Sequence, residues 1–282
     1  MICQWQELIN ILPIWLRKPV DEQGRDCMQE LRLRLHQPPE IVMPRKSSFL
    51  ERIVSSEDLS YILNMATKYS PWTAETIKEG FVTSVGGHRI GLCGEFTGYS
   101  QDVRNIRNLS SVCIRAAREI PGVSGNVFKQ NGSILIIGKP GSGKTTFLRD
   151  LVCKFSDYGD GAVVVVDERR EIFPSVAGKL FFRTGKRTDV LSGCKKTKGL
   201  EMALRTMSPS IIAVDEITAA EDCEALSYAA WCGVRLIATA HAGSKKELYS
   251  RPIYQSILAN GIFNTLIVLQ SDKSWQEESM AE

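Results

Sequence analysis

No apolar run in the 282-residue sequence reaches about 18 residues, the length that a membrane-spanning helix requires. The chain has only three histidines, and its eight cysteines include no C-x-x-C pair, so a metal centre built from histidine and cysteine is not expected. A secretory leader is also missing, which predicts a cytoplasmic protein with reduced thiols. The formal net charge of +3 is too small to indicate nucleic-acid binding by itself.

What the sequence does contain is the composition of a soluble globular protein, with 43% hydrophobic and 24% charged residues. The length suits one large domain or two ordinary ones. Near the start, apolar residues recur at helical spacing and predict a helix over residues 2–16. Basic residues adjoin it only at Arg17 and Lys18, which favours a core-facing helix over one that lies on a membrane surface.

A turn-rich segment, EIPGVSGNVFKQNGS (119–133), separates two halves with different patterns. We therefore predict an amino-terminal α+β domain over residues 1–125 and a second domain over residues 126–282. Alternation of Leu and Arg predicts a strand at 31–35 in the first of these domains.

Two further elements are predicted in the amino-terminal half. Helical spacing indicates a helix over residues 57–69, for which Ser56 is the expected N-cap. The glycine pair Gly86-Gly87 lies between two short strand patterns and predicts the turn of a β-hairpin.

In the second half, short continuous apolar runs alternate with helical patterns. The predicted strands are 133–138, 162–167, 211–216, 235–240 and 265–270. The predicted helices are about 144–156, 198–207, 220–231 and 245–258. Continuous apolar strands separated by helices indicate an α/β domain with a parallel sheet covered on both faces. A ligand is then expected outside the carboxyl ends of the strands.

The sequence GKPGSGKT (138–145) follows the first of these strands and matches the pattern G-x-x-x-x-G-K-[ST] in full. Its glycines let backbone N–H groups converge on phosphate oxygens at the positive end of the helix dipole. Lys144 supplies a cation for the β- and γ-phosphates, and the Thr145 hydroxyl can bind magnesium, so ATP and Mg²⁺ are the expected ligands. The residues expected to bind nucleotide are Gly138, Lys139, Pro140, Gly141, Ser142, Gly143, Lys144, Thr145 and Thr146.

Two of the predicted strands end on adjacent carboxylates, Asp167-Glu168 and Asp215-Glu216. IIAVDE (211–216) is the Walker B pattern, in which Asp215 would hold magnesium through water. Hydrolysis also needs a carboxylate that activates the attacking water, and Glu168 and Glu216 are both candidates because parallel strands end at one edge of the sheet. Solvated loop charges balanced by neighbouring arginines are an equally compatible interpretation of the first pair.

The strand pattern RLIATAH (235–241) ends with Thr239 and His241. A polar side chain at this position can contact the γ-phosphate, so His241 is a candidate catalytic residue. A purely structural histidine remains an open alternative, and Arg205, at the end of the predicted helix that leads into the Walker B strand, is ambiguous in the same way.

The segment KLFFRTGKRTDVLSGCKKTK (179–198) carries a strong local excess of basic residues, with Asp189 as its single acid. It predicts a mobile loop that meets an anionic partner, which could be nucleic acid, an acidic protein or a neighbouring subunit. A merely solvated loop is equally compatible. Its basic residues are Lys179, Arg183, Lys186, Arg187, Lys195, Lys196 and Lys198.

Taken in order, GKPGSGKTT, VVVVDERREI, ALRTMSPSIIAVDEI and LIATAHA resemble the ATPases that power type II and type IV secretion and pilus motors. ELRLRLHQPPEI (30–41), GGHRIGLCGE (86–95) and SSVCIRAAREIPG (110–122) narrow the resemblance to the family of stage III sporulation protein AA of endospore-forming bacteria. The resemblance covers nearly the whole chain except about the last dozen residues.

The resemblance implies a RecA-like P-loop ATPase domain with a predominantly parallel sheet, preceded by a smaller α+β domain. It also implies an ATP-hydrolysing motor that forms a ring, expected to be a hexamer. Such a motor would work at the cytosolic face of the mother-cell membrane towards the forespore, with membrane proteins of a sporulation channel as partners. Nucleic acid is not an expected partner in this interpretation.

Carried over residue by residue, the resemblance makes Glu168 the preferred catalytic base, with Asp167 as an alternative. Thr145 and Asp215 would serve the metal, and His241 occupies the histidine-box position. Secretion ATPases often have Gly-Glu at Walker B and Glu-Asp in the acidic box. This chain has Asp-Glu at both positions, which leaves Glu216 as a competing base. Arginines of the amino-terminal domain complete such sites, and the candidates are Arg89, Arg115 and Arg118.

Two other functions remain compatible with the sequence. One is a nucleic-acid-dependent ATPase that uses the basic segment 179–198, and the other is a regulatory nucleotide-binding module with little turnover. No motif that reads the base is recognisable, so the sequence does not distinguish ATP from GTP.

Overall fold

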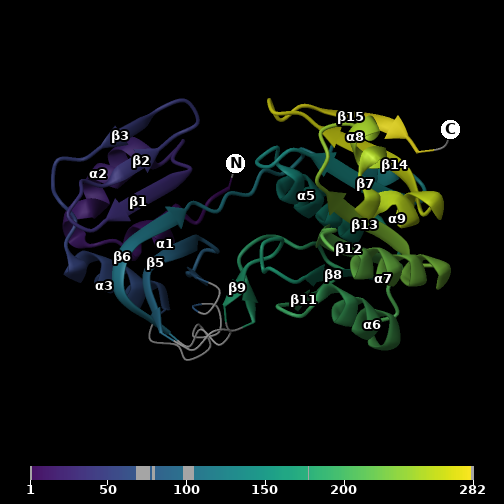
Figure 1. The fold of residues 1–282 in the computed structure, drawn as a ribbon, viewed down its shortest axis with the longest axis horizontal. Helices are drawn as coiled ribbons and strands as arrows, with labels where there is room; N and C mark the ends of the chain where they lie inside the picture. Colours follow the sequence, from purple (N-terminus) through teal and green to yellow (C-terminus); the bar gives the residue numbers. More distant parts are fainter. Residues whose placement is uncertain (1, 68–76, 78–79, 98–104, 177, 281–282) are drawn as a thin grey trace. The chain divides into compact units, whose positions relative to one another are not determined.

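The computed structural model describes residues 2–67, 77, 80–97, 105–176 and 178–280 (Figure 1). The chain divides into two compact units. The amino-terminal unit comprises Met1–Glu119 and Pro174–Phe182, and the carboxy-terminal unit comprises Ile120–Phe173 and Arg183–Glu282. The predicted boundary at 125/126 thus falls inside the second unit, and the assignment of 174–182 to the first unit has no counterpart in the sequence analysis.

The amino-terminal unit is built on an antiparallel sheet with the strand order β3-β2-β1-β6-β5-β4. The strands are β1 (Glu30–Arg34), β2 (Glu40–Val42), β3 (Ser47–Phe49), β4 (Phe81–Thr83), β5 (Arg89–Thr97) and β6 (Asn105–Arg115). Its helices are α1 (Trp5–Asn10), α2 (Ile14–Gly24) and α3 (Ser56–Thr67). Apolar side chains from all three helices and the central strands form one buried core, so this unit is the predicted α+β fold.

The segment 174–182 contributes the short antiparallel pair β9 (Ser175–Val176) and β10 (Lys179–Leu180). Within the amino-terminal unit, the side-chain amide of Gln4 donates a hydrogen bond to the carbonyl of Phe181, at 3.1 Å. A Cβ atom on Gly87 would lie 3.4 Å from both the Phe181 and Pro174 side chains. The segment 174–182 is therefore packed closely against the rest of the amino-terminal unit.

Two helical predictions in this unit need correction. The helix predicted over 2–16 is two helices, α1 and α2, because Pro13 lacks an N–H group and disfavours helical backbone in the residue before it. Ser56 is the first residue of α3 rather than its cap. Ser55 caps the helix, since its hydroxyl accepts from the Asp58 N–H and its own N–H donates to the Asp58 carboxylate. Residues 68 and 69 of the predicted helix lie outside the described residues.

The predicted hairpin turn is confirmed. Strands β4 and β5 pair antiparallel, and Gly86 and Gly87 between them have φ angles of 89° and 78°. Residues other than glycine rarely adopt this backbone conformation, which explains why glycine occupies both positions.

The carboxy-terminal unit contains a seven-stranded sheet with the order β11-β8-β12-β13-β7-β14-β15 (Figure 1). All its pairings are parallel except that of β15 with β14. The strands are β7 (Ser133–Gly138), β8 (Val163–Asp167), β11 (Thr188–Ser192), β12 (Ile211–Glu216), β13 (Arg235–Ala240), β14 (Phe263–Leu269) and β15 (Trp275–Ser279). The prediction of a predominantly parallel sheet is confirmed, whereas β11 and β15 were not predicted.

Helices cover both faces of this sheet, as the continuous apolar runs predict. Helix α5 (Lys144–Tyr158) packs against β7, β8, β11, β12 and β13. Alternate residues of the central strands point the other way and pack with α6 (Lys196–Thr206) and α7 (Ala220–Trp231) in a second apolar cluster. The first turn of α5 and the carboxyl ends of the strands are thereby fixed at one edge of the sheet.

Two other predicted segments differ from the structure. The helix predicted over 245–258 is divided into α8 (Lys245–Ser250), a 3₁₀ turn η3 (Pro252–Tyr254) and α9 (Gln255–Ala259), because Pro252 interrupts the helical hydrogen bonds. The basic segment 179–198 is ordered into β10, β11 and the start of α6 rather than forming one mobile loop.

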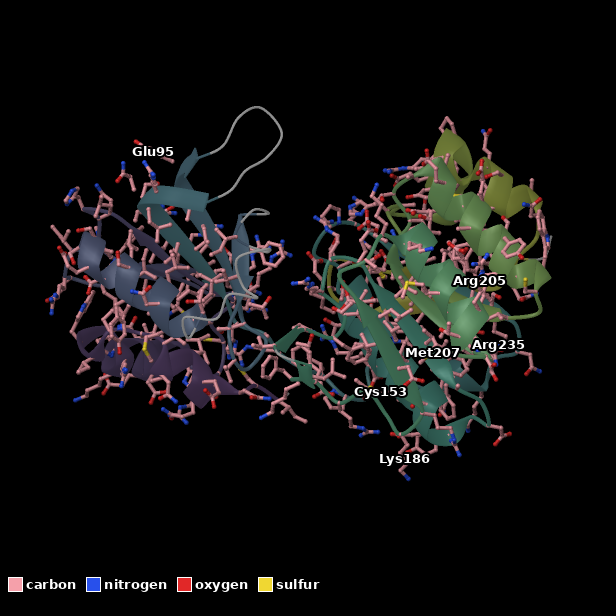
Figure 2. The ribbon with its side chains drawn as sticks, turned by 90° about the horizontal axis from the view of Figure 1, so that it is seen from below. Glu95, Cys153, Lys186, Arg205, Met207 and Arg235 are labelled. Carbon is pink, nitrogen blue, oxygen red and sulfur yellow. The ribbon has the colours of Figure 1, made fainter. Side chains whose placement is uncertain are left out.

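Several basic residues of that segment have intramolecular partners. Arg183 pairs with Asp157, and Arg187 donates to backbone carbonyls at the end of α5. Lys196 is buried, with 2% of its side chain exposed. Lys186, in contrast, is exposed and labelled in Figure 2. The basic excess in the sequence therefore overstates the positive charge available to a partner.

Candidate nucleotide-binding site

The phosphate loop connects β7 to α5, in the strand–loop–helix arrangement that the sequence predicts. Gly141 and Gly143 have φ angles of 73° and 101°, values that favour glycine. A Cβ atom on Gly138 would lie 2.3 Å from Ser142 Oγ, so this position also has no room for a side chain. Ser142 Oγ is buried and has no hydrogen-bond partner, as expected of a group placed to meet a phosphate oxygen.

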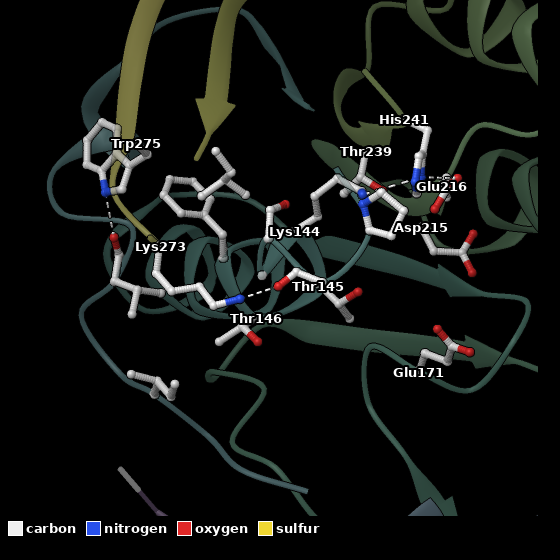
Figure 3. A pocket seen from close by; sticks show the side chains of 18 of the residues that line it. Lys144, Thr145, Thr146, Glu171, Asp215, Glu216, Thr239, His241, Lys273 and Trp275 are labelled. Carbon is white, nitrogen blue, oxygen red and sulfur yellow. Dashed lines mark hydrogen bonds and ion pairs between the residues drawn. The ribbon is translucent and has the colours of Figure 1, made fainter. Parts of the chain in front are cut away.

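A pocket of about 450 Å³ opens over this loop (Figure 3). Its volume falls in the usual range for small-molecule sites. The described residues that line it are Ile120, Val123, Pro140, Gly141, Ser142, Gly143, Lys144, Thr145, Thr146, Phe147, Arg169, Glu171, Asp215, Glu216, Thr239, His241, Leu269, Lys273 and Trp275. The loop, the Walker B pair and the candidate histidine thus meet at one pocket, although their segments are far apart in the sequence.

Lys144 is the first residue of α5, and its side chain is largely buried in the loop. Its ammonium donates to the carbonyls of Gly138 and Lys139, at 2.9 and 3.4 Å. Burial lowers the pKa of Lys144, an effect opposed by the nearby Glu216 carboxylate. An ammonium that rests on loop carbonyls is available to turn towards an anionic ligand.

Asp215 is the clearest candidate for a metal-binding group in the pocket. It is 8% exposed, and neither of its carboxylate oxygens has a hydrogen-bond partner. Burial raises its pKa to about 6, although the Lys196 ammonium 3.3 Å away opposes this shift. Buried carboxylate oxygens without donors are costly unless a cation satisfies them.

These residues fit magnesium. Mg²⁺ prefers oxygen ligands and typically binds through one or two protein groups together with water and substrate phosphates. The Thr145 hydroxyl and the Asp215 carboxylate line the same pocket as the phosphate loop. Among the described residues no group of three His, Cys, Asp or Glu side chains could hold a metal alone.

Glu216 and His241 are in direct contact in the pocket, with 2.7 Å between Glu216 Oε1 and His241 Nδ1 (Figure 3). At this distance the carboxylate requires a hydrogen atom on Nδ1. The Lys144 ammonium lies 3.4 Å from the same nitrogen. His241 is therefore held by the Walker B glutamate and lies next to the phosphate-loop lysine, and the buried Thr239 lines the same pocket.

Asp167, the first residue of the other acidic pair, has a structural role. Its side chain is completely buried and accepts hydrogen bonds from the backbone N–H groups of Glu171, Ile172 and Phe173, at 2.8, 3.0 and 2.8 Å. Burial raises the pKa of Asp167 despite these donors. Because both of its oxygens are engaged in shaping the loop after β8, Asp167 is poorly placed to act as a base.

Glu168, the base preferred from sequence, is not among the described residues that line the pocket. Its carboxylate instead lies 3.5 Å from the Lys196 ammonium. That ammonium also donates to Asp222 and to the carbonyl of Glu216, at 3.1 and 2.7 Å. Lys196 therefore connects the two acidic strand ends without lining the pocket. The sequence analysis named Lys196 only as one of the basic residues of segment 179–198.

The acidic side chain that the loop after β8 does bring to the pocket is Glu171. Its backbone is held at both ends, since its N–H donates to Asp167 and its carbonyl accepts from Arg149 at 3.0 Å. The turn that aims it inward includes Arg170, whose φ angle is 56°. Sequence reasoning missed Glu171 because the apolar run ends five residues before it, at Val166, and a turn inside DERRE is not visible as a pattern.

The remaining candidate arginines lie elsewhere. Arg205 pairs with Glu201 on α6, is 76% exposed, and is not among the lining residues (Figure 2). Arg89 lies over the Phe81 ring and Arg115 pairs with Glu30, both within the amino-terminal unit.

Arg118, the third arginine candidate, donates to two backbone carbonyls within residues 25–28 of the same unit. A role for any of the three in completing a nucleotide site stays a prediction.

One end of the pocket is apolar and was not predicted. Ile120 and Val123 come from the segment before β7, and Trp275 comes from β15. The Trp275 indole donates to the Val123 carbonyl at 2.9 Å and meets the Phe147 ring edge-on, with 5.5 Å between ring centres. An aromatic–aliphatic wall of this kind is suited to a planar ring.

Comparison with known proteins decides the family. The family described as "Sporulation stage III, protein AA" matches residues 3–278. The chain belongs to this family. It is 34% identical over 281 residues to Stage III sporulation protein AA of Bacillus subtilis (strain 168), covering 95% of this chain and 91% of that protein.

Solved structures show the same fold. The pilus retraction motor PilT with bound ADP matches with a TM-score of 0.63 and 19% identity, over 90% of this chain and 76% of that one. The Legionella pneumophila ATPase DotB matches with a TM-score of 0.62 and 16% identity, over 94% and 79%. At these identities the likeness establishes the fold alone, and it covers both units. No helix among the described residues is long and apolar enough to cross a membrane.

Proposed function

We propose that this protein is a Mg²⁺-dependent ATPase that hydrolyses ATP in the pocket over residues 138–145. The observation that carries the proposal is the meeting of a complete phosphate loop with a buried Asp215 whose oxygens lack hydrogen-bond donors. The family's sporulation description and the fold shared with PilT and DotB, named as a motor and an ATPase, support it.

The lining of the pocket suggests how the nucleotide would lie. The apolar end formed by Ile120, Val123 and Trp275 suits the base, and the loop suits the phosphates. The acidic end, with Asp215 and Glu216, then receives the terminal phosphate. Lys144 would exchange its loop carbonyls for phosphate oxygens, because an ammonium gains more from an anion than from a neutral acceptor.

Thr145 and Asp215 would hold the magnesium ion. When bound, Mg²⁺ neutralises charge that develops on the phosphoryl oxygens. The contact with His241 keeps the Glu216 carboxylate at the same end of the pocket. Lys144 lies 3.4 Å from the Nδ1 atom of His241. A terminal phosphate that binds Lys144 would therefore change the surroundings of His241, and this histidine would respond to the presence of the phosphate.

For the general base, the proposal assigns Glu171 in place of Glu168. Secretion ATPases, which the chain resembles, use a carboxylate of the acidic box after the second strand. In this chain the box side chain that lines the pocket is Glu171. Glu216 is the second candidate, but His241 Nδ1 lies 2.7 Å from its carboxylate and competes with the proton of an attacking water, whereas the Arg169 guanidinium lies 3.9 Å from the Glu171 carboxylate.

The proposed assembly is a ring of this chain, expected to have six subunits, at the cytosolic face of the mother-cell membrane during sporulation. In this view ATP hydrolysis powers or assembles a channel made by membrane proteins. The resemblance to secretion motors and the family description support this part. Action on nucleic acid is the alternative, and the intramolecular use of Arg183, Arg187 and Lys196 weakens it.

The test measures phosphate release and particle mass together, with Mg²⁺–ATP, Mg²⁺–GTP and single-stranded DNA or RNA as separate additions. We expect Mg²⁺-dependent turnover by a ring-sized particle, no stimulation by nucleic acid, and loss of turnover in Lys144→Ala. Lys198→Ala, which removes an exposed lysine paired with Glu201, is the control and should behave like the wild type. Undiminished turnover in Lys144→Ala would refute the site.

A further inference from the structure

The hairpin that joins β14 to β15 places an unexpected cation over the phosphate loop. Lys273, in the turn of this hairpin, lines the nucleotide pocket together with Lys144. Its ammonium donates a hydrogen bond to the carbonyl of Gly141, inside the loop (Figure 3). Its Cδ atom also lies 3.9 Å from the position that a Cβ atom of Gly143 would take. The side chain thus extends across the loop from a distant part of the sequence.

The turn that carries Lys273 is firmly built. The Asp272 carboxylate accepts from the N–H and the hydroxyl of Ser274, at 2.9 and 2.6 Å, and the Lys273 N–H donates to Gln270. Lys273 itself has a φ angle of 73°, which is uncommon for a residue with a side chain. The hairpin turn requires this conformation at Lys273, so the turn sets the direction in which its side chain leaves the backbone.

The hairpin is also anchored to the helix that follows the loop. Trp275, two residues after Lys273, donates to the Val123 carbonyl and packs edge-on against Phe147 of α5. Five residue pairs hold β15 against β14, from Thr265↔Ser279 to Leu269↔Trp275. The Lys273 backbone is therefore fixed relative to the loop, and only its flexible side chain has to move to reach a ligand.

The charge on Lys273 is not used elsewhere. In the part of the chain that the structure describes, Lys273 makes no ion pair with a carboxylate, and its ammonium rests on a neutral carbonyl. Lys144 is in the same condition, since it rests on the carbonyls of Gly138 and Lys139. Two ammonium groups on carbonyls of one anion-binding loop form a cradle suited to a di- or triphosphate.

We propose that Lys273 is a second phosphate-binding cation, which leaves the Gly141 carbonyl and contacts the phosphates of a bound nucleoside di- or triphosphate. The contact is supplied within one subunit by the carboxy-terminal hairpin. This role rests on the proposed function, because it requires the pocket to be a nucleotide site. It differs from that of the three amino-terminal arginines, which the resemblance offers for completing the site.

The experiment measures the affinity of fluorescent methylanthraniloyl-ADP and of ADP in competition, in EDTA so that no metal contributes. Lys273→Met should weaken binding by about ten-fold, the usual loss for one charge-assisted hydrogen bond, and Lys273→Arg should retain most of the affinity. The difference in ADP affinity between the wild type and Lys273→Met should narrow as the salt concentration rises from about 0.05 M to about 0.5 M, since salt screens exposed charges.

The matched control is Lys245→Met. Lys245 donates to the Ser279 carbonyl at the far end of β15, at 2.9 Å, and does not line the pocket. It should leave ADP affinity unchanged, and both methionine variants should melt at similar temperatures.

Three outcomes would overturn or redirect the proposal. Wild-type affinity in a folded Lys273→Met variant would refute it, and so would tighter binding, which would show that Lys273 obstructs the pocket. Failure of the wild-type protein to bind ADP at all would instead refute the proposed function.

Discussion

The two acidic strand ends of this protein look alike in sequence but differ in structure. Asp167 and Asp215 each follow four buried residues of neighbouring parallel strands, and each precedes a glutamate. Asp167 accepts three backbone hydrogen bonds, whereas Asp215 accepts none and faces the nucleotide pocket. One aspartate builds a loop, and the other is the group that would hold the cation in the proposed function.

The residues that follow each aspartate make this difference. After Asp167 the chain turns at Arg170 and returns the N–H groups of residues 171–173 to the carboxylate. After Asp215 the chain runs towards α7, where Asp222 accepts the N–H groups of Thr218 and Ala219. Because the Asp222 carboxylate accepts from these N–H groups, they do not donate to Asp215. The hydrogen bonding of Asp215 thus depends on a residue seven positions away.

The largest expected effect follows removal of the lysine that joins the two strand ends. Lys196→Met should lower the free energy of unfolding by about 3–5 kcal/mol, because buried carboxylates lose their cation. Lys198→Met, on the same helix but with a 61% exposed side chain, should change stability by less than about 0.5 kcal/mol. Urea unfolding of both variants measures the difference, and equal stabilities would show that Lys196 does not hold the two ends together.

The next effect compares the same substitution at the loop-building strand end. Asp167→Asn should lower the free energy of unfolding by about 3 kcal/mol, since three backbone donors lose a charged acceptor. Asp189→Asn, at an exposed position on β11, is the matched control for removing one negative charge. Thermal and urea unfolding provide the readout, and an unchanged midpoint for Asp167→Asn would contradict the structural role.

At the other strand end, the same substitution should act with the opposite sign. Asp215→Asn should raise the free energy of unfolding of the nucleotide-free protein by about 1–2 kcal/mol near pH 7, because the cost of burying this carboxylate outweighs its attraction to the Lys196 ammonium 3.3 Å away. The pKa of Asp215 is raised from 3.8 to about 6, so the folded state binds this proton more tightly than the unfolded state. The free energy of unfolding of the wild type should therefore fall as pH rises from 3.8 to about 6. The difference in stability between Asp215→Asn and the wild type should grow across the same pH range.

Unfolding experiments at several pH values between 4 and 7, without nucleotide or magnesium, test this prediction. Destabilisation by Asp215→Asn at pH 7 would show that its oxygens have donors in solution. The matched pair Asp167→Asn and Asp215→Asn is informative because the chemistry of the change is identical and only the surroundings differ.

Local patterns were sufficient for the parallel sheet, the phosphate loop and the convergence of Asp215, Glu216 and His241 on one pocket. These features follow from strand periodicity and from the shared edge at which parallel strands end. The contributions of Glu171 and Lys273 depend on turns, at Arg170 and at Lys273 itself, that residue type does not reveal. Proline positions would have corrected two helices, since Pro13 and Pro252 are visible in the sequence.

The preference for Glu168 as the base differs from our proposal for another reason. Its place beside Asp167 suggested that it faced the nucleotide, but its carboxylate lies 3.5 Å from the buried Lys196 ammonium, 28 positions away in the sequence. Such a partner is fixed by tertiary packing of α6 against β8 and β12, which has no local signature.

Single-turnover ATP hydrolysis by Glu171→Gln and Glu168→Gln, with ATP affinity measured in parallel, tests the central claim most directly. We expect Glu171→Gln to bind ATP but to hydrolyse it about 100-fold or more slowly, whereas Glu168→Gln should stay within about five-fold of the wild type. Near-normal hydrolysis in Glu171→Gln, with the slow step moved to Glu168→Gln or Glu216→Gln, would contradict the account.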